Sequence, residues 1–103
     1  MIIYNVTINI DEEAHEQWLN WMKQKHIPDV MATGLFVSSK ILRVLSKQED
    51  ESGFTYAIQY TCADMETYER YQKEFAHALQ AETQQLFGGK FAAFRTLLEE
   101  VLV

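Results

Sequence analysis

Residues 2–10 decide the fold, because every even-numbered position is apolar and all the odd-numbered positions but Ile3 are polar. The stretch reads Ile2-Ile3-Tyr4-Asn5-Val6-Thr7-Ile8-Asn9-Ile10. Successive side chains of a strand point to opposite faces, so the even-numbered residues predict one strongly apolar face. Residues 54–62 repeat the pattern, with Phe54, Tyr56, Ile58, Tyr60 and Cys62 on the apolar side. We therefore expect two strands with one face buried and a mixed opposite face.

Two helices and two further strands are predicted around these. The acidic residues 11–13 favour a helix start, and helical spacing continues to about residue 26, where we expect Pro28 and Gly34 to end the helix. A second β run covers about 35–46, and residues 46–53 form a solvated hairpin loop. Asp64 is a good N-cap for a helix that runs to about Phe87, before Gly88-Gly89. The last strand is expected over 94–102.

The predicted order β-α-β-β-α-β is typical of the ferredoxin-like fold. In this α+β arrangement, a four-stranded antiparallel sheet carries both helices on one face, and the right-handed crossover places the first and third strands at the centre. The 103 residues contain no linker or repeat, so residues 1–103 are interpreted as a single domain. The sequence leaves open whether the last strand, which ends in Val101-Leu102-Val103, pairs within its chain or with a partner subunit.

Composition narrows the classes of function. The net charge is −6 and charged residues make up 23% of the chain, which argues against nucleic acid or an anionic membrane as the main partner. We see no signal peptide and no membrane-length apolar run, so we expect a cytoplasmic protein. The single cysteine excludes an internal disulfide, and the histidines lack metal-ligand spacing. We predict no metal site.

The chain resembles a small bacterial family of similar length with no assigned function. The resemblance rests on the leading strand from Met1 to Thr7, on His26-Ile27-Pro28, on Gly34-Leu35-Phe36 and on the late segment Phe91 to Thr96. More widely, the chain is similar to the dimeric α+β barrel superfamily, which includes the antibiotic biosynthesis monooxygenases. This resemblance implies a homodimer with two facing sheets, and often a small-molecule cavity between sheet and helices. It does not imply one chemistry.

The predicted topology gathers several aromatic residues and a histidine at one end of the domain. His26 could act as a general base there, and a phenol could orient a carbonyl. The alternative is that these are core aromatic residues, with His26 as a cation at a helix C-terminus. The predicted ligand-binding residues are Tyr4, Asn5, Trp21, His26, Phe36, Tyr60 and Tyr68.

Asn5 has two interpretations. In oxygenases of the superfamily a strand-one Asn can help to bind substrate or oxygen, and Asn5 matches that position; otherwise it is a hydrogen-bonding residue of the dimer face. Heme-degrading members add a helix-two His, which suggests a comparison with His77. However, the Trp expected near the end of strand three is absent at Tyr60-Thr61-Cys62. We interpret His77 as a solvated helix residue and predict no cofactor.

Two arginines on strands, Arg43 and Arg95, could receive a carboxylate, although an ion pair with a strand acid such as Glu99 is the commoner outcome. Three functions therefore stay open. In the first, the chain is a homodimer that binds a small apolar or aromatic ligand. In the second, it is a cofactor-independent oxygenase or isomerase that acts on an aromatic or polyketide-like substrate. In the third, it is a dimeric interaction module without chemistry. The sequence alone does not decide whether the protein is an enzyme.

Overall fold

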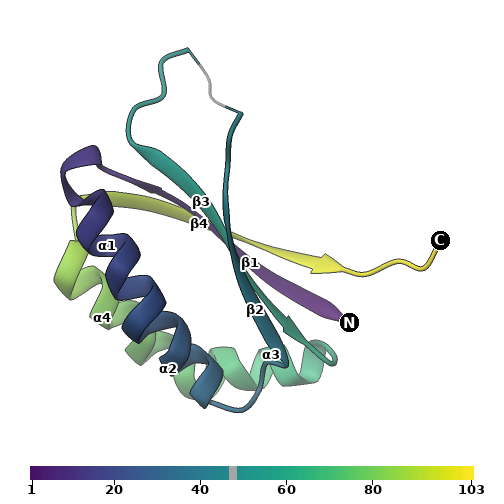
Figure 1. Ribbon diagram of the computed structural model, residues 1–103. Coiled ribbons are helices and arrows are strands. Elements are labelled where there is room, and N and C mark those ends of the chain that lie inside the picture. Colours follow the sequence, from purple (N-terminus) through teal and green to yellow (C-terminus); the bar gives the residue numbers. More distant parts are fainter. Residues whose placement is uncertain (47–48) are drawn as a thin grey trace.

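The structure is a computed structural model that describes residues 1–46 and 49–103. One antiparallel sheet is covered on one face by two long helical segments (Figure 1). The strands are β1 (Ile2–Ile10), β2 (Ser38–Arg43), β3 (Phe54–Cys62) and β4 (Phe91–Glu99). Their order β2-β3-β1-β4 confirms the ferredoxin-like prediction and the central position of the first and third strands.

Each helical segment is interrupted by a five-residue π-helical turn. The first segment contains a short 3₁₀ turn (Glu12–Ala14), α1 (His15–Trp21), the first π turn (Met22–His26) and α2 (Ile27–Ala32). The second contains α3 (Met65–Tyr71), the second π turn (Gln72–Ala76) and α4 (His77–Phe87). No helix in the described ranges is long and apolar enough to span a membrane.

The first helix does not end near residue 26, so that prediction was wrong. The amide of Ile27 bonds to the carbonyl of Met22, five residues back, and Pro28 then falls in the first turn of α2. Proline fits a first helical turn, where its missing N–H costs little. The segment continues to Ala32, and Gly34 follows with a φ of +79°. The wide π turn therefore lets the chain pass Pro28 without leaving the helix.

The last strand begins at Phe91 instead of Phe94, because β4 pairs with the whole length of β1. Ile10 is opposite Phe91 and Ile2 is opposite Glu99, so the strand stays within its own chain (Figure 1). Sequence reasoning passed over Ala92 and Ala93 because alanine has low strand propensity. The second strand is also shorter than the predicted run 35–46, although Val37 and Val44 still donate backbone bonds to β3. Of the predicted hairpin loop, Lys47 and Gln48 lie outside the described residues.

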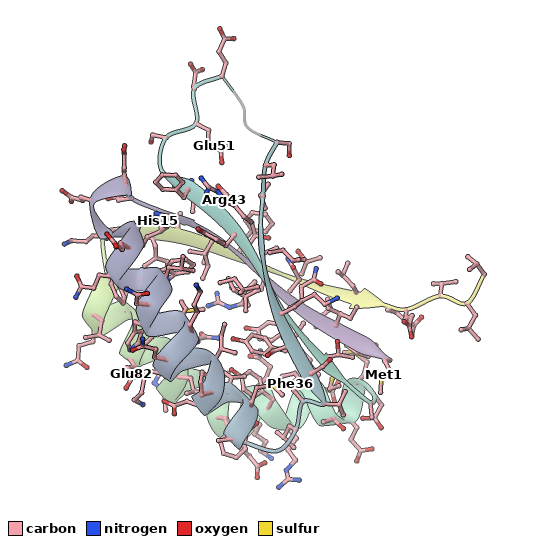
Figure 2. All side chains as sticks on the ribbon, in the orientation of Figure 1. Met1, His15, Phe36, Arg43, Glu51 and Glu82 are labelled. Carbon is pink, nitrogen blue, oxygen red and sulfur yellow. The ribbon has the colours of Figure 1, made fainter. Side chains whose placement is uncertain are left out.

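The core lies between the sheet and the helices, where side chains fill most of the space (Figure 2). The apolar face of β1 is buried along its length, and Trp18 of α1 and Val30 of α2 have no exposed surface. Asp64 caps α3 as predicted, since its carboxylate accepts a bond from the amide of Thr67 at 2.8 Å. Met65, at the start of the same helix, remains exposed.

The opposite face of the sheet carries no helix (Figure 1). We call it the open face. The register places one apolar row across the four strands, with a polar row beside it. The apolar row contains Leu42, Ala57 and Phe94 and is interrupted on β1 by Thr7, and the polar row contains Lys40, Gln59, Asn5 and Thr96.

Candidate functional site

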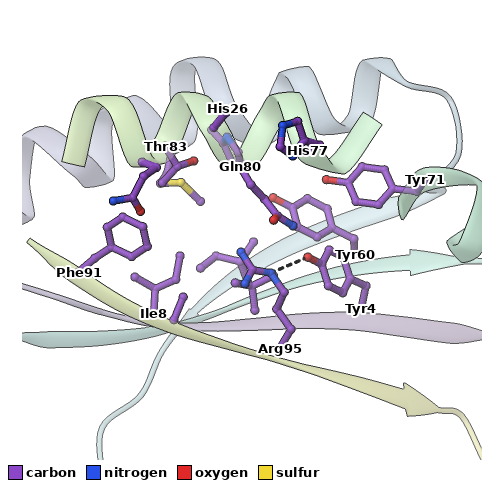
Figure 3. A pocket seen from close by; sticks show the side chains of 16 residues that line it. Tyr4, Ile8, His26, Tyr60, Tyr71, His77, Gln80, Thr83, Phe91 and Arg95 are labelled. Atoms are coloured by element: carbon purple, nitrogen blue, oxygen red, sulfur yellow. Dashed lines mark hydrogen bonds between the residues drawn. The ribbon is translucent and has the colours of Figure 1, made fainter. Parts of the chain in front are cut away.

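A cavity of about 520 Å³ lies between the sheet and the helices (Figure 3). Its floor comes from β1, β3 and β4, and its wall comes from the first π turn, from Tyr71 at the end of α3 and from α4. The exposed lining residues belong to α4 and β4, so the cavity opens to solvent between these elements. The floor contains Tyr4, Val6, Ile8, Ile58, Tyr60, Phe91, Ala93 and Arg95, and the wall contains Met22, His26, Tyr71, His77, Gln80, Ala81, Thr83 and Gln84.

The π turns place side chains on the helical wall. His26 is the last residue of the first π turn, while Tyr71 precedes the second and His77 follows it. A π turn shifts the register of the residues after it relative to a regular α-helix, and such turns occur frequently at functional sites. His77 was expected to be rotated away from the apolar stripe. The structure shows that it is exposed, as predicted, but that it also lines the cavity.

Arg95 and Tyr4 form a polar pair on the cavity floor (Figure 3). Arg95 Nε donates a hydrogen bond to the Tyr4 hydroxyl over 3.0 Å, and Tyr4 is buried. Within the described residues, no carboxylate lies within 4 Å of the Arg95 guanidinium. The expected ion pair with Glu99 does not form. Four residues along a strand span about 13 Å, too far for a direct contact.

His26 is largely buried in the helical wall. Its burial lowers the pKa to about 4; Asp29 acts in the opposite direction, and Lys25 adds to the lowering. In the described part of the chain, the buried Nδ1 has no hydrogen-bond partner. The ring packs against Trp21 at a centroid distance of 4.9 Å. His26 is therefore a neutral residue within a helix, and its interpretation as a charged C-terminal cation was wrong.

Two buried phenols complete the polar part of the lining. Burial raises the pKa of both Tyr60 and Tyr71, so their hydroxyls stay protonated at neutral pH. Among the residues described, neither hydroxyl makes a hydrogen bond, and neither oxygen is fully enclosed by protein, so both reach the cavity. A hydroxyl that faces a cavity can pair with water or with a ligand there. Both groups are available as donors to an occupant of the cavity.

The predicted site residues separate into three groups. Tyr4, His26 and Tyr60 line the cavity. Phe36 and Tyr68 instead support Tyr4, with ring centroids 6.3 and 5.2 Å from its ring. Trp21 packs behind His26 and contacts Phe87 at 5.4 Å. Most of the predicted aromatic cluster therefore exists, but part of it is supporting core.

Asn5 lies on the other face of the sheet. Its amide donates to Thr7 over 3.0 Å and accepts from Gln59 over 3.2 Å. Only 8% of this residue is exposed, although it faces away from the helices. Asn5 and His77 are thus on opposite sides of the sheet and do not share this cavity.

Sequence reasoning missed Arg95, Tyr71 and Gln80 as cavity residues. The position of Arg95 within the predicted last strand could have indicated the cavity, because it puts the side chain on the same face of the sheet as the apolar residues of β1. The register confirms this phase, since Arg95 is opposite Val6. Gln80 carried no such signal, because the π turn that precedes it changes which residues of α4 face inward.

The described residues hold no group of three or more His, Cys, Asp or Glu side chains that could bind a metal ion. Cys62 is buried, as expected for the apolar face of β3. Its thiol donates to the Asp64 carbonyl over 3.4 Å, and burial raises its pKa. The protonated thiol is a weak nucleophile, so nothing here supports a catalytic cysteine.

Fold and cavity together define a ferredoxin-like α+β domain with a small-molecule-sized cavity between its layers. Residues 1–101 match the family described as a domain of unknown function (DUF4286), and the chain belongs to this family. Comparison with curated proteins finds no match.

Several solved structures share the fold at low sequence identity. An ethyl tert-butyl ether d (ethd) family protein from Bacillus halodurans c-125 is 15% identical with a TM-score of 0.71, over 98% of this chain and 100% of that chain. HapK from Hahella chejuensis is 13% identical with a TM-score of 0.70, over 98% and 93%. A dimeric ferredoxin-like protein from an uncultured marine organism is 14% identical with a TM-score of 0.65, over 98% and 97%. At these identities the likeness establishes the fold alone.

Proposed function

We propose that the chain binds a small, largely apolar molecule with an aromatic ring in the cavity between sheet and helices. The cavity itself carries this proposal. Its volume of about 520 Å³ falls within the roughly 300–1,000 Å³ of small-molecule sites. Aliphatic and aromatic side chains such as Ile8, Ile58 and Phe91 form much of its floor, and a few polar groups converge on the same space. That combination is typical of a ligand site.

A neutral fluorescent probe tests this proposal. N-phenyl-1-naphthylamine brightens in apolar surroundings, and we expect it to bind saturably to the wild-type protein. Ala93→Trp adds a large ring to the cavity floor and should reduce that binding at least tenfold. Ala78→Trp is the control, because it adds the same ring at an exposed position of α4 outside the lining. Absence of saturable binding, or equal binding to all three proteins, would contradict the proposal.

An enzymatic role is the second candidate, and one observation favours it. His26 lines the same cavity as Tyr4, Tyr60 and Tyr71 and is a neutral imidazole, so it can accept a proton from a carbon acid such as an aromatic ketone. A pKa of about 4 makes this imidazole a weaker base than an ordinary one, which is why we place binding first. Exchange of the α-hydrogens of 2-tetralone into D₂O, followed by NMR, tests this role. A base would accelerate the exchange, and His26→Gln would remove the acceleration.

We propose further that the chain forms a homodimer through the open face. Phe94 is 63% exposed there, and Leu42 and Leu98 are also exposed on the same side of the sheet. Apolar side chains gathered on an uncovered sheet face favour association. Two fold neighbours are described as dimeric ferredoxin-like proteins, which supports a homodimer. A dimer that fails to bind the probe would leave the interaction module without chemistry as the remaining function.

A further inference from the structure

The charged residues that line the cavity differ in sign from those of the chain as a whole. The sequence has 15 acidic residues against 9 basic ones, yet no Asp or Glu belongs to the cavity lining in the described part of the structure. The lining holds one permanent cation, Arg95, and several groups that donate hydrogen bonds. A carboxylate ligand entering this cavity meets donors without a competing protein anion.

Within the described residues, Arg95 has N–H donors that no protein group accepts. A guanidinium carries five N–H groups, and one of them, on Nε, is used by the Tyr4 hydroxyl. Among the residues that the structure describes, the terminal nitrogens of Arg95 have no protein acceptor. The bond to Tyr4, drawn as a dashed line in Figure 3, restrains the guanidinium at Nε and leaves its terminal nitrogens available. A planar guanidinium held in this way matches the two oxygens of a carboxylate.

The phenols add to this preference. Tyr60 and Tyr71 stay protonated because burial raises the pKa of each, and their hydroxyls lack a partner within the described residues. A neutral apolar ligand would displace water from these hydroxyls and leave them unpaired. A ligand with an acceptor oxygen satisfies them.

The charges around the cavity favour a ligand with a single negative charge. Arg95 is the one arginine of the described lining and neutralises one carboxylate, and the net charge of −6 disfavours a more highly charged anion. The apolar floor around Ile8, Ile58 and Phe91 leaves the rest of the ligand without polar partners. Sugar phosphates and nucleotides do not suit this surface.

We propose that the ligand is an aromatic monoanion whose carboxylate lies against the terminal nitrogens of Arg95 and whose ring lies over Ile8 and Ile58. This inference rests on the proposed binding function and names the chemical class of its ligand. It makes Arg95 the residue that selects an anionic ligand, with Tyr4 as the residue that positions it.

A matched pair of probes tests the class. 2-Naphthoate and 2-naphthamide have the same ring system and differ in charge, and calorimetric titration measures each affinity. We expect the wild-type protein to bind the carboxylate about tenfold more tightly than the amide, since hydrogen bonds to charged groups are the stronger ones. Arg95→Gln should abolish this preference and leave amide binding unchanged. Arg95→Lys should retain part of the preference, because it keeps the charge without the planar fork.

Arg43→Gln is the control, because it removes the same charge from a residue outside the lining. Arg43 stacks on Phe54 at 4.9 Å and lies far from Phe36, toward the loop between β2 and β3 (Figure 2). It should behave as the wild type with both probes. Equal affinity for carboxylate and amide, or equal weakening of both by Arg95→Gln, would overturn the anionic class while leaving the binding function intact. If neither these probes nor N-phenyl-1-naphthylamine binds, both proposals fail together.

Discussion

Arg95 Nε donates a hydrogen bond to the hydroxyl of Tyr4 over 3.0 Å, although the two residues are 91 positions apart in the chain. Tyr4 lies on the central strand β1 and Arg95 on the edge strand β4, where Arg95 is opposite Val6. They are therefore diagonal neighbours on the helix-facing side of the sheet, within reach of long side chains. The pair links the buried aromatic cluster to the mouth of the cavity.

Removing the acceptor of this bond should cost stability. Tyr4→Phe leaves the ring in place and deletes the hydroxyl, so we expect a loss of about 1 kcal/mol in the free energy of unfolding, measured with urea. Tyr60→Phe is the matched control. Its hydroxyl has no partner in the described part of the chain, and the variant should be as stable as the wild type or more so. Equal losses in the two variants would contradict the role of the Arg95 bond.

The burial of His26 predicts a pH dependence of stability. Its pKa falls from 6.5 in the unfolded chain to about 4 in the fold, so between these values the unfolded state binds more protons. Stability should therefore decrease as the pH drops from about 6.5 to 4, by up to about 3 kcal/mol. Urea unfolding across this range measures the slope, which His26→Gln should flatten and His77→Gln should retain. A wild-type slope that persists in His26→Gln would mean that another group causes it.

Two glycines with positive φ should respond very differently to alanine. A Cβ at Gly53 would lie 2.4 Å from the carbonyl oxygen of Ile10, whereas a Cβ at Gly34 meets no atom within 4 Å. Gly34→Ala should lower the free energy of unfolding by about 1 kcal/mol, because alanine disfavours the left-handed backbone at this position. Gly53→Ala should cost distinctly more, because the backbone of β1 must shift. Thermal unfolding of both variants checks the order, and a Gly53→Ala protein as stable as Gly34→Ala would contradict the close approach.

A charge on the open face should separate the proposed dimer. Phe94→Glu places a carboxylate in the apolar row, and we expect light scattering to give a monomer mass at micromolar concentration. Leu86→Glu is the control, because Leu86 is an exposed leucine of α4 on the helical layer. It should leave the dimer mass unchanged. A wild-type protein that is already monomeric at this concentration would contradict the proposed dimer.

The sequence alone predicted the sheet well because its signal is local. The alternation of apolar and polar residues in β1 and β3 directly indicates which side chains are buried. The order of helices and strands is then compatible with only a few sheet topologies. The start of β4 was missed at Ala92 and Ala93, since strand pairing with β1 outweighs the low propensity of alanine. Strand boundaries depend on the partner strand, which local sequence does not contain.

The cavity was harder to predict than the sheet. The gathering of Tyr4, His26 and Tyr60 followed from topology, but the π turn that holds His26 and the π turn that precedes His77 left no recognisable pattern. The hydrogen-bond partner of Arg95 also could not be predicted from the sequence. Choosing the Tyr4 hydroxyl over Glu99 requires the register of β4 against β1, which the sequence does not specify.

Amide chemical shifts of the ¹⁵N-labelled protein, followed during titration with 2-naphthoate, locate the ligand residue by residue. We expect saturable shifts at residues that line the cavity, including Ile8, His77 and Arg95, and unchanged amides at Glu49 and Asp50, which lie outside the lining. Shifts that cluster on the open face around Phe94 and Leu42, or no saturable shifts at all, would contradict a ligand site between the sheet and the helices.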